Sequence, residues 1–503
     1  MQFPAQLRDV VKAGIESLVA TNNPPTLFVH AESLSVIDIK TQEARPLSSS
    51  QLKLAISDSA NWFDLITTKR GEVEKAAYPR TDVVAAIHSA QGKWLGIPHL
   101  EGIADVPVIT RASGLLTKPG YDADSGIYLL PGGYADVPPT PSNPTTAEIN
   151  AALSLILNEL LVDFPFADDA SRANALALFL LPFVRDLIEG PTPLHHIDAP
   201  QEGTGKSLLA ETWGWVSVGA DIKSFSEPDG GDWQKLILAE LMNAPRYIFI
   251  DNVNKILDSG NLASALTSPV ISGRLLGFTQ TVKADVRCVW ISSGNNIRMS
   301  GEISRRTVSI RLDASKNDAH QGRTFRHSLP RWAKLNRGKL VGACLTLCQA
   351  WLASGYKPGR KLLGKYESWS AVMDGILSVA GITDLLGNDK DFRKEASSVI
   401  DEWAAFIPAW WDMFHGQRVG VRELHELAAS RDAFGSLFES AKGEKSERTR
   451  LGKALGSMRD RTFGSLKLLK DSGTDKNGCN QYRLSNMSQS LLPEPDENGE
   501  GTL

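Results

Sequence analysis

Short apolar runs of strand length alternate with helical periods through the middle of the chain. Residues 247–250 and 286–291 are compact, largely apolar runs that lead into polar residues, and residues 194–197 form a shorter run of strand length. Residues 147–162 and 168–188 carry apolar side chains at helical spacing. Strands of this kind separated by helices are typical of a parallel sheet that binds ligands at the carboxyl ends of its strands. The pattern therefore predicts an α/β fold in which the polar strand ends form one site.

Residues 26–131 mix short β-like runs with turn signals, and we expect one helix to interrupt them, at residues 80–89. Paired carboxylates that would mark a catalytic site are not apparent in this stretch. Residues 136–145 are rich in proline, serine and threonine, which is the composition of a linker. We therefore expect a mixed α/β N-terminal domain at 1–135.

The first predicted strand leads into Pro200–Ser207, which reads Pro-Gln-Glu-Gly-Thr-Gly-Lys-Ser and opens a helix. Two glycines let successive backbone NH groups face one point and cradle phosphate, and the lysine adds a positive charge. The serine hydroxyl is a ligand that Mg²⁺ accepts. The loop predicts that the chain binds ATP, although proline replaces the first glycine of the motif, and the expected binding residues are Gly203, Thr204, Gly205, Lys206 and Ser207.

The other strand ends extend this site. Asp251 follows the strand at 247–250, where its carboxylate can complete the octahedral Mg²⁺ shell that Ser207 begins. Asn295 follows the next strand, where an amide can orient the attacking water or touch the γ-phosphate, although Gly-Asn-Asn is also strong turn chemistry. Arg305 and Arg306 precede another apolar strand, and either is a candidate for the arginine that a neighbouring subunit contributes.

Composition narrows the class of protein. The 503 residues are 42% hydrophobic and 22% charged, which is ordinary for several globular domains. The longest apolar run is too short to cross a bilayer and residues 1–20 lack a signal-peptide core, so we expect a cytoplasmic protein without a membrane partner. Four scattered cysteines fit neither a zinc ribbon nor a disulfide framework. With a net charge of −4, any contact with nucleic acid requires local basic patches.

The order of these motifs resembles a known family. Gly-Thr-Gly-Lys-Ser, Ile-Phe-Ile-Asp-Asn-Val, Trp-Ile-Ser-Ser-Gly-Asn-Asn and Ser-Arg-Arg-Thr-Val are similar to the Walker A, Walker B, sensor 1 and arginine-finger segments of AAA+ ATPases. The arrangement resembles superfamily 3 type replicative helicases of phages, plasmids and integrated mobile elements, including prophage primase-helicase proteins. The resemblance implies a homo-hexamer that acts on DNA, with a primase or polymerase encoded separately, and catalytic roles for Lys206, Asp251, Asn295, Arg305 and Arg306.

The resemblance also implies an architecture. A linker and helical collar at 136–190 would precede an AAA+ P-loop core with a parallel sheet at 191–315. A helical subdomain at 316–400, a winged-helix DNA-binding domain at 401–490 and a disordered tail at 491–503 would follow.

Two segments are candidates for DNA contact. Superfamily 3 helicases place a DNA-contacting hairpin just before the sensor strand, which makes Lys283 a candidate, with Phe278 nearby and Arg274 as a second possible intersubunit arginine. Near the C-terminus, two helices, a basic helix at about 446–461 and a hairpin are typical of a winged helix, in which Arg448, Arg450 and Lys453 would face DNA. A basic face used for solubility or protein contact is the alternative.

One departure from the family pattern affects catalysis. Asn252 stands where these ATPases usually carry a catalytic glutamate, and an amide cannot act as a general base. Glu202, Glu227, Asp229 and Asp232 are candidates to replace that carboxylate, and all four remain open at this point.

The predicted function is that of an ATP-dependent DNA helicase or translocase for replication of a phage, plasmid or mobile element. One alternative is an AAA+ ATPase that does not unwind DNA, such as a loader, a transposition factor or a defence factor. Another is a DNA-binding switch that binds ATP with little hydrolysis, which Asn252 would favour.

Overall fold

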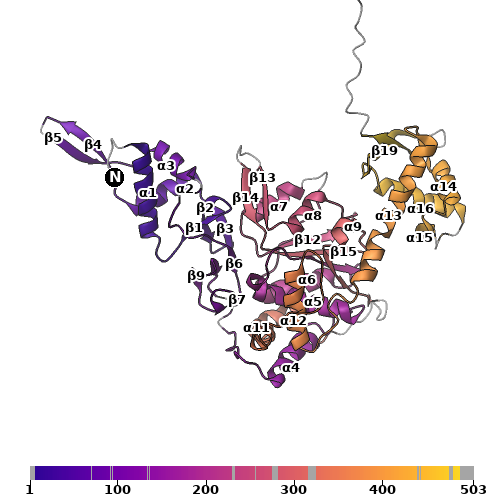
Figure 1. The fold of residues 1–503 in the computed structure, drawn as a ribbon, viewed down its shortest axis with the longest axis horizontal. Helices are drawn as coiled ribbons and strands as arrows, with labels where there is room; N and C mark the ends of the chain where they lie inside the picture. The colour runs from indigo at the N-terminus through magenta and orange to yellow at the C-terminus, as the bar shows by residue number, and fades with distance from the viewer. Residues whose placement is uncertain are drawn as a thin grey trace, which may run out of the picture. The chain divides into compact units, whose positions relative to one another are not determined.

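The computed structural model describes residues 6–69, 71–90, 92, 94–132, 134, 136–228, 233–254, 256–274, 281–314, 325–438, 441, 443–474 and 480–487. They form a mixed α/β structure (Figure 1). The chain divides into two compact units: the first holds Met1–Asn254, Asp258–Ile297 and Arg305–Phe392, and the second holds Lys255–Leu257, Arg298–Ser304 and Arg393–Leu503. Within the described residues, no helix combines the length and the apolar character needed to cross a membrane.

A four-stranded parallel sheet lies at the centre of the first unit, as the sequence predicts. Its strand order is β12-β15-β11-β16. The strands are β11 (Leu194–Ala199), β12 (Tyr247–Val253), β15 (Val289–Asn295) and β16 (Thr307–Arg311). Because all four run in the same direction, their carboxyl ends meet at one edge of the sheet.

Helices cover one face of this sheet. Ile197, Ile291 and Ile310 point into a core that is shared with these helices. The two helices before the sheet are interrupted earlier than the apolar spacing predicts, because the first continues as a π-helix and the second gives way to a 3₁₀ turn soon after Pro182. The helices are α4 (Thr146–Ser154), η1 (Leu155–Leu160), α5 (Asp169–Val184), η2 (Arg185–Leu187), α6 (Lys206–Ser217), α10 (Leu329–Leu335), α11 (Arg337–Ala353) and α12 (Glu367–Val379).

Further elements of the first unit lie between β11 and β15 in sequence. Helices α7 (Trp233–Leu241) and α8 (Gly260–Thr267) pack against each other. Strands β13 (Val270–Arg274) and β14 (Thr281–Asp285) form an antiparallel pair just before β15. The predicted hairpin before the sensor strand is therefore present, and Phe278 in its connection lies outside the described residues.

The N-terminal residues of the first unit form small sheets and three helices. Most buried residues up to Ile97 pack around a separate core, whereas those between Ala104 and Leu129 join the core of the parallel sheet. The helix predicted at 80–89 is α3, and the helix at 49–59 was not predicted. The strand orders are β1-β2-β3, β6-β10-β9, β4-β5 and β7-β8. The helices are α1 (Leu7–Thr21), α2 (Ser49–Ser59) and α3 (Thr81–His88). The strands are β1 (Leu27–His30), β2 (Ser33–Asp38), β3 (Glu43–Pro46), β4 (Phe63–Thr68), β5 (Gly71–Ala76), β6 (Gly102–Ala104), β7 (Val108–Thr110), β8 (Gly114–Leu116), β9 (Gly120–Asp122) and β10 (Ile127–Leu129).

The second unit contains helices and a four-stranded antiparallel sheet with the order β17-β20-β19-β18. Its core is built around Trp403, Trp410 and Leu455. The basic helix α16 ends at Ser457, four residues earlier than predicted, so Arg459 and Arg461 lie beyond it. The elements are α9 (Gly301–Ser304), α13 (Asp389–Phe414, which begins in the first unit), β17 (Val419–Gly420), α14 (Val421–Ser430), α15 (Gly435–Phe438), α16 (Glu444–Ser457), β18 (Thr462–Phe463), β19 (Leu466–Thr474) and β20 (Asn480–Asn486).

Candidate nucleotide-binding site

The loop between β11 and α6 has the backbone geometry of a phosphate cradle. Gly203 and Gly205 adopt φ angles of 74° and 104°, in the left-handed region that glycine enters without strain. The Thr204 hydroxyl donates to the Gln201 carbonyl at 2.6 Å and closes the turn. Proline fixes φ near −65°, so Pro200 leaves β11 in an ordinary conformation and the sharp turns fall on the two glycines. The loop ends at the first turn of α6, whose unpaired NH groups favour an anion.

Lys206 and Asn295 meet beside this loop. The Lys206 Nζ donates to the Asn295 Oδ1 at 2.6 Å and to the Gln201 carbonyl at 3.2 Å. Asn295 reaches the lysine because β15 pairs with β11 in a register that sets Ala199 opposite Asn295. Burial lowers the pKa of Lys206, and nearby carboxylates oppose this effect. The predicted sensor residue thus contacts the predicted phosphate-binding lysine.

Ser207 and Asp251, the predicted magnesium ligands, also lie together. The Ser207 Oγ donates to the Asp251 Oδ1 at 3.2 Å. The Asp251 Oδ1 also accepts a hydrogen bond from the Ser293 hydroxyl and one from the Asn252 backbone NH at 3.0 Å. A hydroxyl and an oriented carboxylate are oxygen ligands that suit Mg²⁺ alongside nucleotide phosphate oxygens and water. The donor set therefore fits MgATP.

Sequence reasoning did not assign a role to Ser293. Its Oγ also accepts from the Asn252 backbone NH at 3.1 Å, so this one hydroxyl links both residues that follow the apolar part of β12. The two-residue period of β15 puts Ser293 on the same face as Asn295 and Ser292 on the opposite face. That alternation is the signal in the sequence that separates the two serines.

A second polar group lies on the opposite face of the sheet. The Arg311 guanidinium contacts the Asp198 carboxylate and donates to the Asn296 Oδ1 at 3.1 Å. His196 lies next to Asp198, and its Nδ1 is hydrogen-bonded to the Ser292 Oγ at 2.8 Å. Burial raises the pKa of Asp198, but hydrogen bonding from His196 and the charge of Arg311 outweigh burial and hold this pKa below its ordinary value. Asp198 is therefore an ionised carboxylate that interacts with Arg311 and His196.

Arg305 and Arg306 lie at the other end of the sheet. They precede β16, whose first residue Thr307 pairs with Leu194, the first residue of β11. The six residues of β11 separate that edge from the phosphate loop by roughly 20 Å at about 3.3 Å per residue. Arg305 is exposed, whereas Arg306 is half-buried and its charge affects the buried Tyr366 hydroxyl. Neither arginine can reach the phosphate loop of its own chain.

The candidate DNA-contacting residues differ in their surroundings. Lys283 is exposed on β14, with its Nζ 3.6 Å from the Glu32 Oε1. On α16, Arg448 pairs with Glu444, and the Arg450 Nη1 donates to the Leu437 carbonyl at 3.1 Å. Lys453 on the same helix is exposed. Lys283 and Lys453 are thus the more accessible of the predicted DNA contacts.

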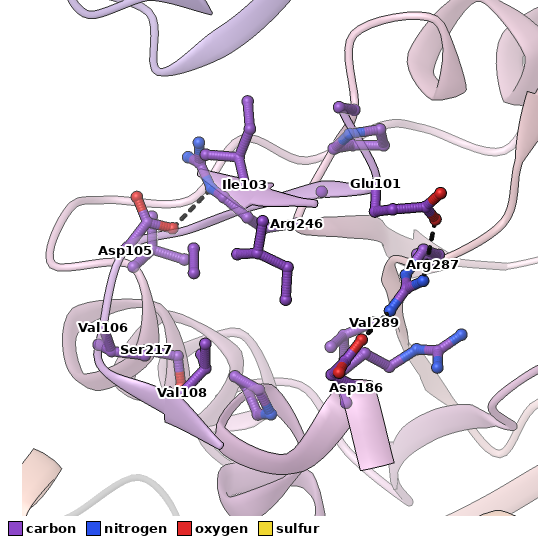
Figure 2. Close-up of a pocket in the computed structure, with 18 of the residues that line it drawn as sticks. Glu101, Ile103, Asp105, Val106, Val108, Asp186, Ser217, Arg246, Arg287 and Val289 are labelled. Carbon is purple, nitrogen blue, oxygen red and sulfur yellow. Dashed lines mark hydrogen bonds and ion pairs between the residues drawn. The ribbon is translucent and has the colours of Figure 1, made fainter. Parts of the chain in front are cut away.

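A pocket of about 90 Å³ lies away from the phosphate loop, where the N-terminal residues meet the amino ends of β12 and β15. Figure 2 shows Arg246 with Asp105 on one side and Arg287 with Glu101 and Asp186 on the other. The pairs made by Asp105 and Glu101 join the N-terminal residues to the residues that precede β12 and β15. The pocket is therefore part of the junction within the first unit.

The sequence and the fold were compared with known proteins. No family model matches the sequence, and none of the curated proteins does. Among solved structures, the apo A form of the NrS-1 C-terminal region is similar at a TM-score of 0.34 and 11% identity, over 87% of this chain and 99% of that chain. The SCCmec type IV Cch active helicase is similar at a TM-score of 0.31 and 12% identity, over 92% of this chain and 98% of that chain. Both TM-scores are below 0.5, so these likenesses carry no conclusion about function.

Proposed function

We propose that the chain is an ATP-dependent DNA helicase or translocase of the AAA+ class whose ATP sites are completed by neighbouring copies in a ring. The observation that carries the proposal is the convergence of Lys206 with Asn295 and of Ser207 with Asp251 at one edge of a parallel sheet. These four residues come from two strand ends and one helix start. The two pairs supply a phosphate-binding cation, a polar sensor and a magnesium-binding pair.

In this proposal the phosphate loop holds the β- and γ-phosphates of ATP. Ser207 and Asp251 hold Mg²⁺, which neutralises charge on the phosphate oxygens. Asn295 ends 2.6 Å from the lysine Nζ, so it is positioned to respond when that lysine turns to the γ-phosphate.

The arginines at the opposite edge support sharing of sites between copies. Arg305 is exposed and lies roughly 20 Å from its own phosphate loop along a strand. An arginine in that place can neutralise the transition state only at a neighbour's site. A closed ring of identical subunits, with six copies as the expected number, provides this arrangement at every interface.

A complementation assay tests the shared site. Lys206→Ala and Arg305→Ala should each abolish DNA-stimulated ATP turnover, because one removes the phosphate-binding cation and the other the neighbour's arginine. Mixing the two variants should restore up to about one quarter of wild-type turnover, since that fraction of random interfaces would hold both an intact lysine and an intact arginine. Arg306→Ala, with a half-buried side chain, is the matched control. Mixtures that stay inactive would refute sharing.

Strand displacement separates unwinding from other uses of ATP. A forked DNA with a labelled strand should lose that strand only when ATP and intact Lys206 are both present. ATP turnover without displacement would support a non-helicase AAA+ ATPase. Binding of ATP and DNA without turnover would support the switch, the alternative that Asn252 favours. Alanine at Lys283 and Lys453, the accessible basic residues, should weaken DNA binding and reduce its salt dependence.

A further inference from the structure

The position where a catalytic glutamate would be expected has an unusual backbone conformation. Asn252 has a φ of 54°, in the left-handed region. Asparagine enters this region readily, whereas a glutamate there would cost roughly 1–2 kcal/mol. The bend turns the Asn252 backbone NH toward both the Asp251 carboxylate and the Ser293 hydroxyl. The local structure thus gives this residue a backbone role, and the carboxylate that activates water must come from another segment.

A short segment runs parallel to β12 on the side away from β15. Phe225 forms a parallel bridge with Ile250. The Phe225 NH donates to the Phe249 carbonyl at 2.8 Å, and the Asp251 NH donates to the Phe225 carbonyl at 3.0 Å. This segment is an additional edge of the parallel ladder, and it heads toward the same carboxyl edge as the phosphate loop.

The segment reaches Glu227 two residues after the bridge, close to the edge of the sheet at which β12 bulges between Ile250 and Val253. Glu227 comes two residues after Phe225, and Asn252 comes two residues after Ile250, its partner in the bridge. Neighbouring strands are about 4.8 Å apart. Pro228 follows Glu227 and disfavours helical backbone at this carboxylate. Glu227 is half-buried, as suits a carboxylate beside a reacting phosphate.

The other carboxylates near the loop are less suited. Glu202 is exposed on the phosphate loop itself. Asp198 already pairs with Arg311 and lies next to His196. Asp229 and Asp232, the two remaining sequence candidates, lie outside the described residues.

We propose that Glu227 is the general base of ATP hydrolysis, supplied by the strand next to β12 in place of a glutamate at position 252. The inference rests on the proposed ATPase function. Water attacks the γ-phosphorus while the bond from this phosphorus to the β,γ-bridging oxygen breaks. Glu227 accepts the proton of the water and later releases it, so that ATP and water become ADP and inorganic phosphate.

The test compares Glu227→Gln with a matched change on the same segment. Asp221→Asn alters an exposed carboxylate that pairs with Lys334, four residues before the bridge. Glu227→Gln should lower kcat by about 100-fold or more, with the affinity for a fluorescent ATP analogue kept within about threefold, because the amide preserves shape but cannot accept a proton. Asp221→Asn should keep wild-type turnover.

A rescue variant distinguishes a base from a structural residue. Adding Asn252→Asp to Glu227→Gln supplies a carboxylate that tolerates the left-handed backbone, and it should recover turnover by about tenfold over the single variant. The acidic limb of the pH profile of kcat should disappear in Glu227→Gln and return in the double variant.

The outcomes separate this proposal from the function on which it rests. A wild-type protein that binds ATP but does not hydrolyse it, with or without DNA, would overturn the ATPase function itself. A hydrolysing wild type whose Glu227→Gln variant keeps kcat within about threefold would overturn only the role of Glu227. Loss of ATP binding together with turnover, without recovery in the double variant, would also overturn it, because that result indicates a structural role.

Discussion

The Ser293 hydroxyl is expected to set the magnesium requirement of the protein without touching the metal. It donates to the Asp251 carboxylate and accepts from the Asn252 NH, so it fixes the direction of the carboxylate that faces Ser207. A hydrogen bond to an ionised group contributes roughly 1.5–3 kcal/mol, and about 1.4 kcal/mol corresponds to tenfold in an equilibrium constant. Ser293→Ala should therefore raise the Mg²⁺ concentration for half-maximal ATP turnover by about 10- to 100-fold.

The assay is a magnesium titration of ATP turnover at saturating nucleotide, repeated as a titration of fluorescent ATP-analogue binding. Ser292→Ala is the matched control, because Ser292 is the preceding residue on β15 but bonds to His196 at 2.8 Å on the opposite face. The control should lose stability and keep the wild-type magnesium requirement. Equal requirements in Ser293→Ala and the wild type, or equal increases in both variants, would refute the orienting role.

Three further predictions concern the packing around the site. Burial raises the pKa of Asp105 from 3.8 to about 6, so the stability that goes with its neutral form is present below pH 4 and lost as the pH rises through 6. As the pH rises from 4 to 7, the unfolding free energy of Asp105→Asn should therefore increase by about 3 kcal/mol relative to that of the wild type. Urea titrations in which the difference between variant and wild type does not change with pH would contradict this. Burial raises the pKa of Cys288 and Cys344 to about 12, and it also raises the pKa of Cys348. Iodoacetamide at pH 8 should therefore label these three thiols only after unfolding, which mass spectrometry can measure. Asn174→Ala should cost about 1–3 kcal/mol in urea unfolding, because it leaves the Leu386 NH without its partner and removes the shorter of two side-chain hydrogen bonds to the Ser309 carbonyl. A loss below about 1 kcal/mol would show that the site relaxes.

The sequence predicts local motifs of this protein better than it predicts which residues pair across strands. The phosphate loop, the strand before Asp251 and the parallel sheet are local or periodic features, and the structure contains each of them. The contact of Ser293 with Asp251 joins residues 42 positions apart, and its existence depends on how β15 pairs with β12. Periodicity shows which face a residue occupies but not its partner across the sheet.

The carboxylate at the edge of the sheet shows the same limit. Phe225 joins the ladder through one isolated bridge, which is too short to leave an alternating pattern in the sequence. The sequence alone therefore leaves Glu227 as one of four open candidates, and the Phe225 bridge is the observation that favours it in our proposal. The early ends of the helices before the sheet had a different cause, since a π-helix and a 3₁₀ turn keep nearly the same apolar spacing as an α-helix.

Strand β16 has a mechanical consequence for a ring. Its five residues connect Arg305 and Arg306 at one end to Arg311, which holds Asp198 beside the phosphate loop, at the other. A strand hydrogen-bonded to β11 along its length behaves as a stiff rod of about 17 Å. In a ring of the proposed kind, a push on the arginine at one interface would move the nucleotide pocket of the next. Such a coupling favours sequential ATP hydrolysis around the ring over independent hydrolysis by each subunit. Sequential hydrolysis would be observed as a cooperative dependence of turnover on ATP concentration.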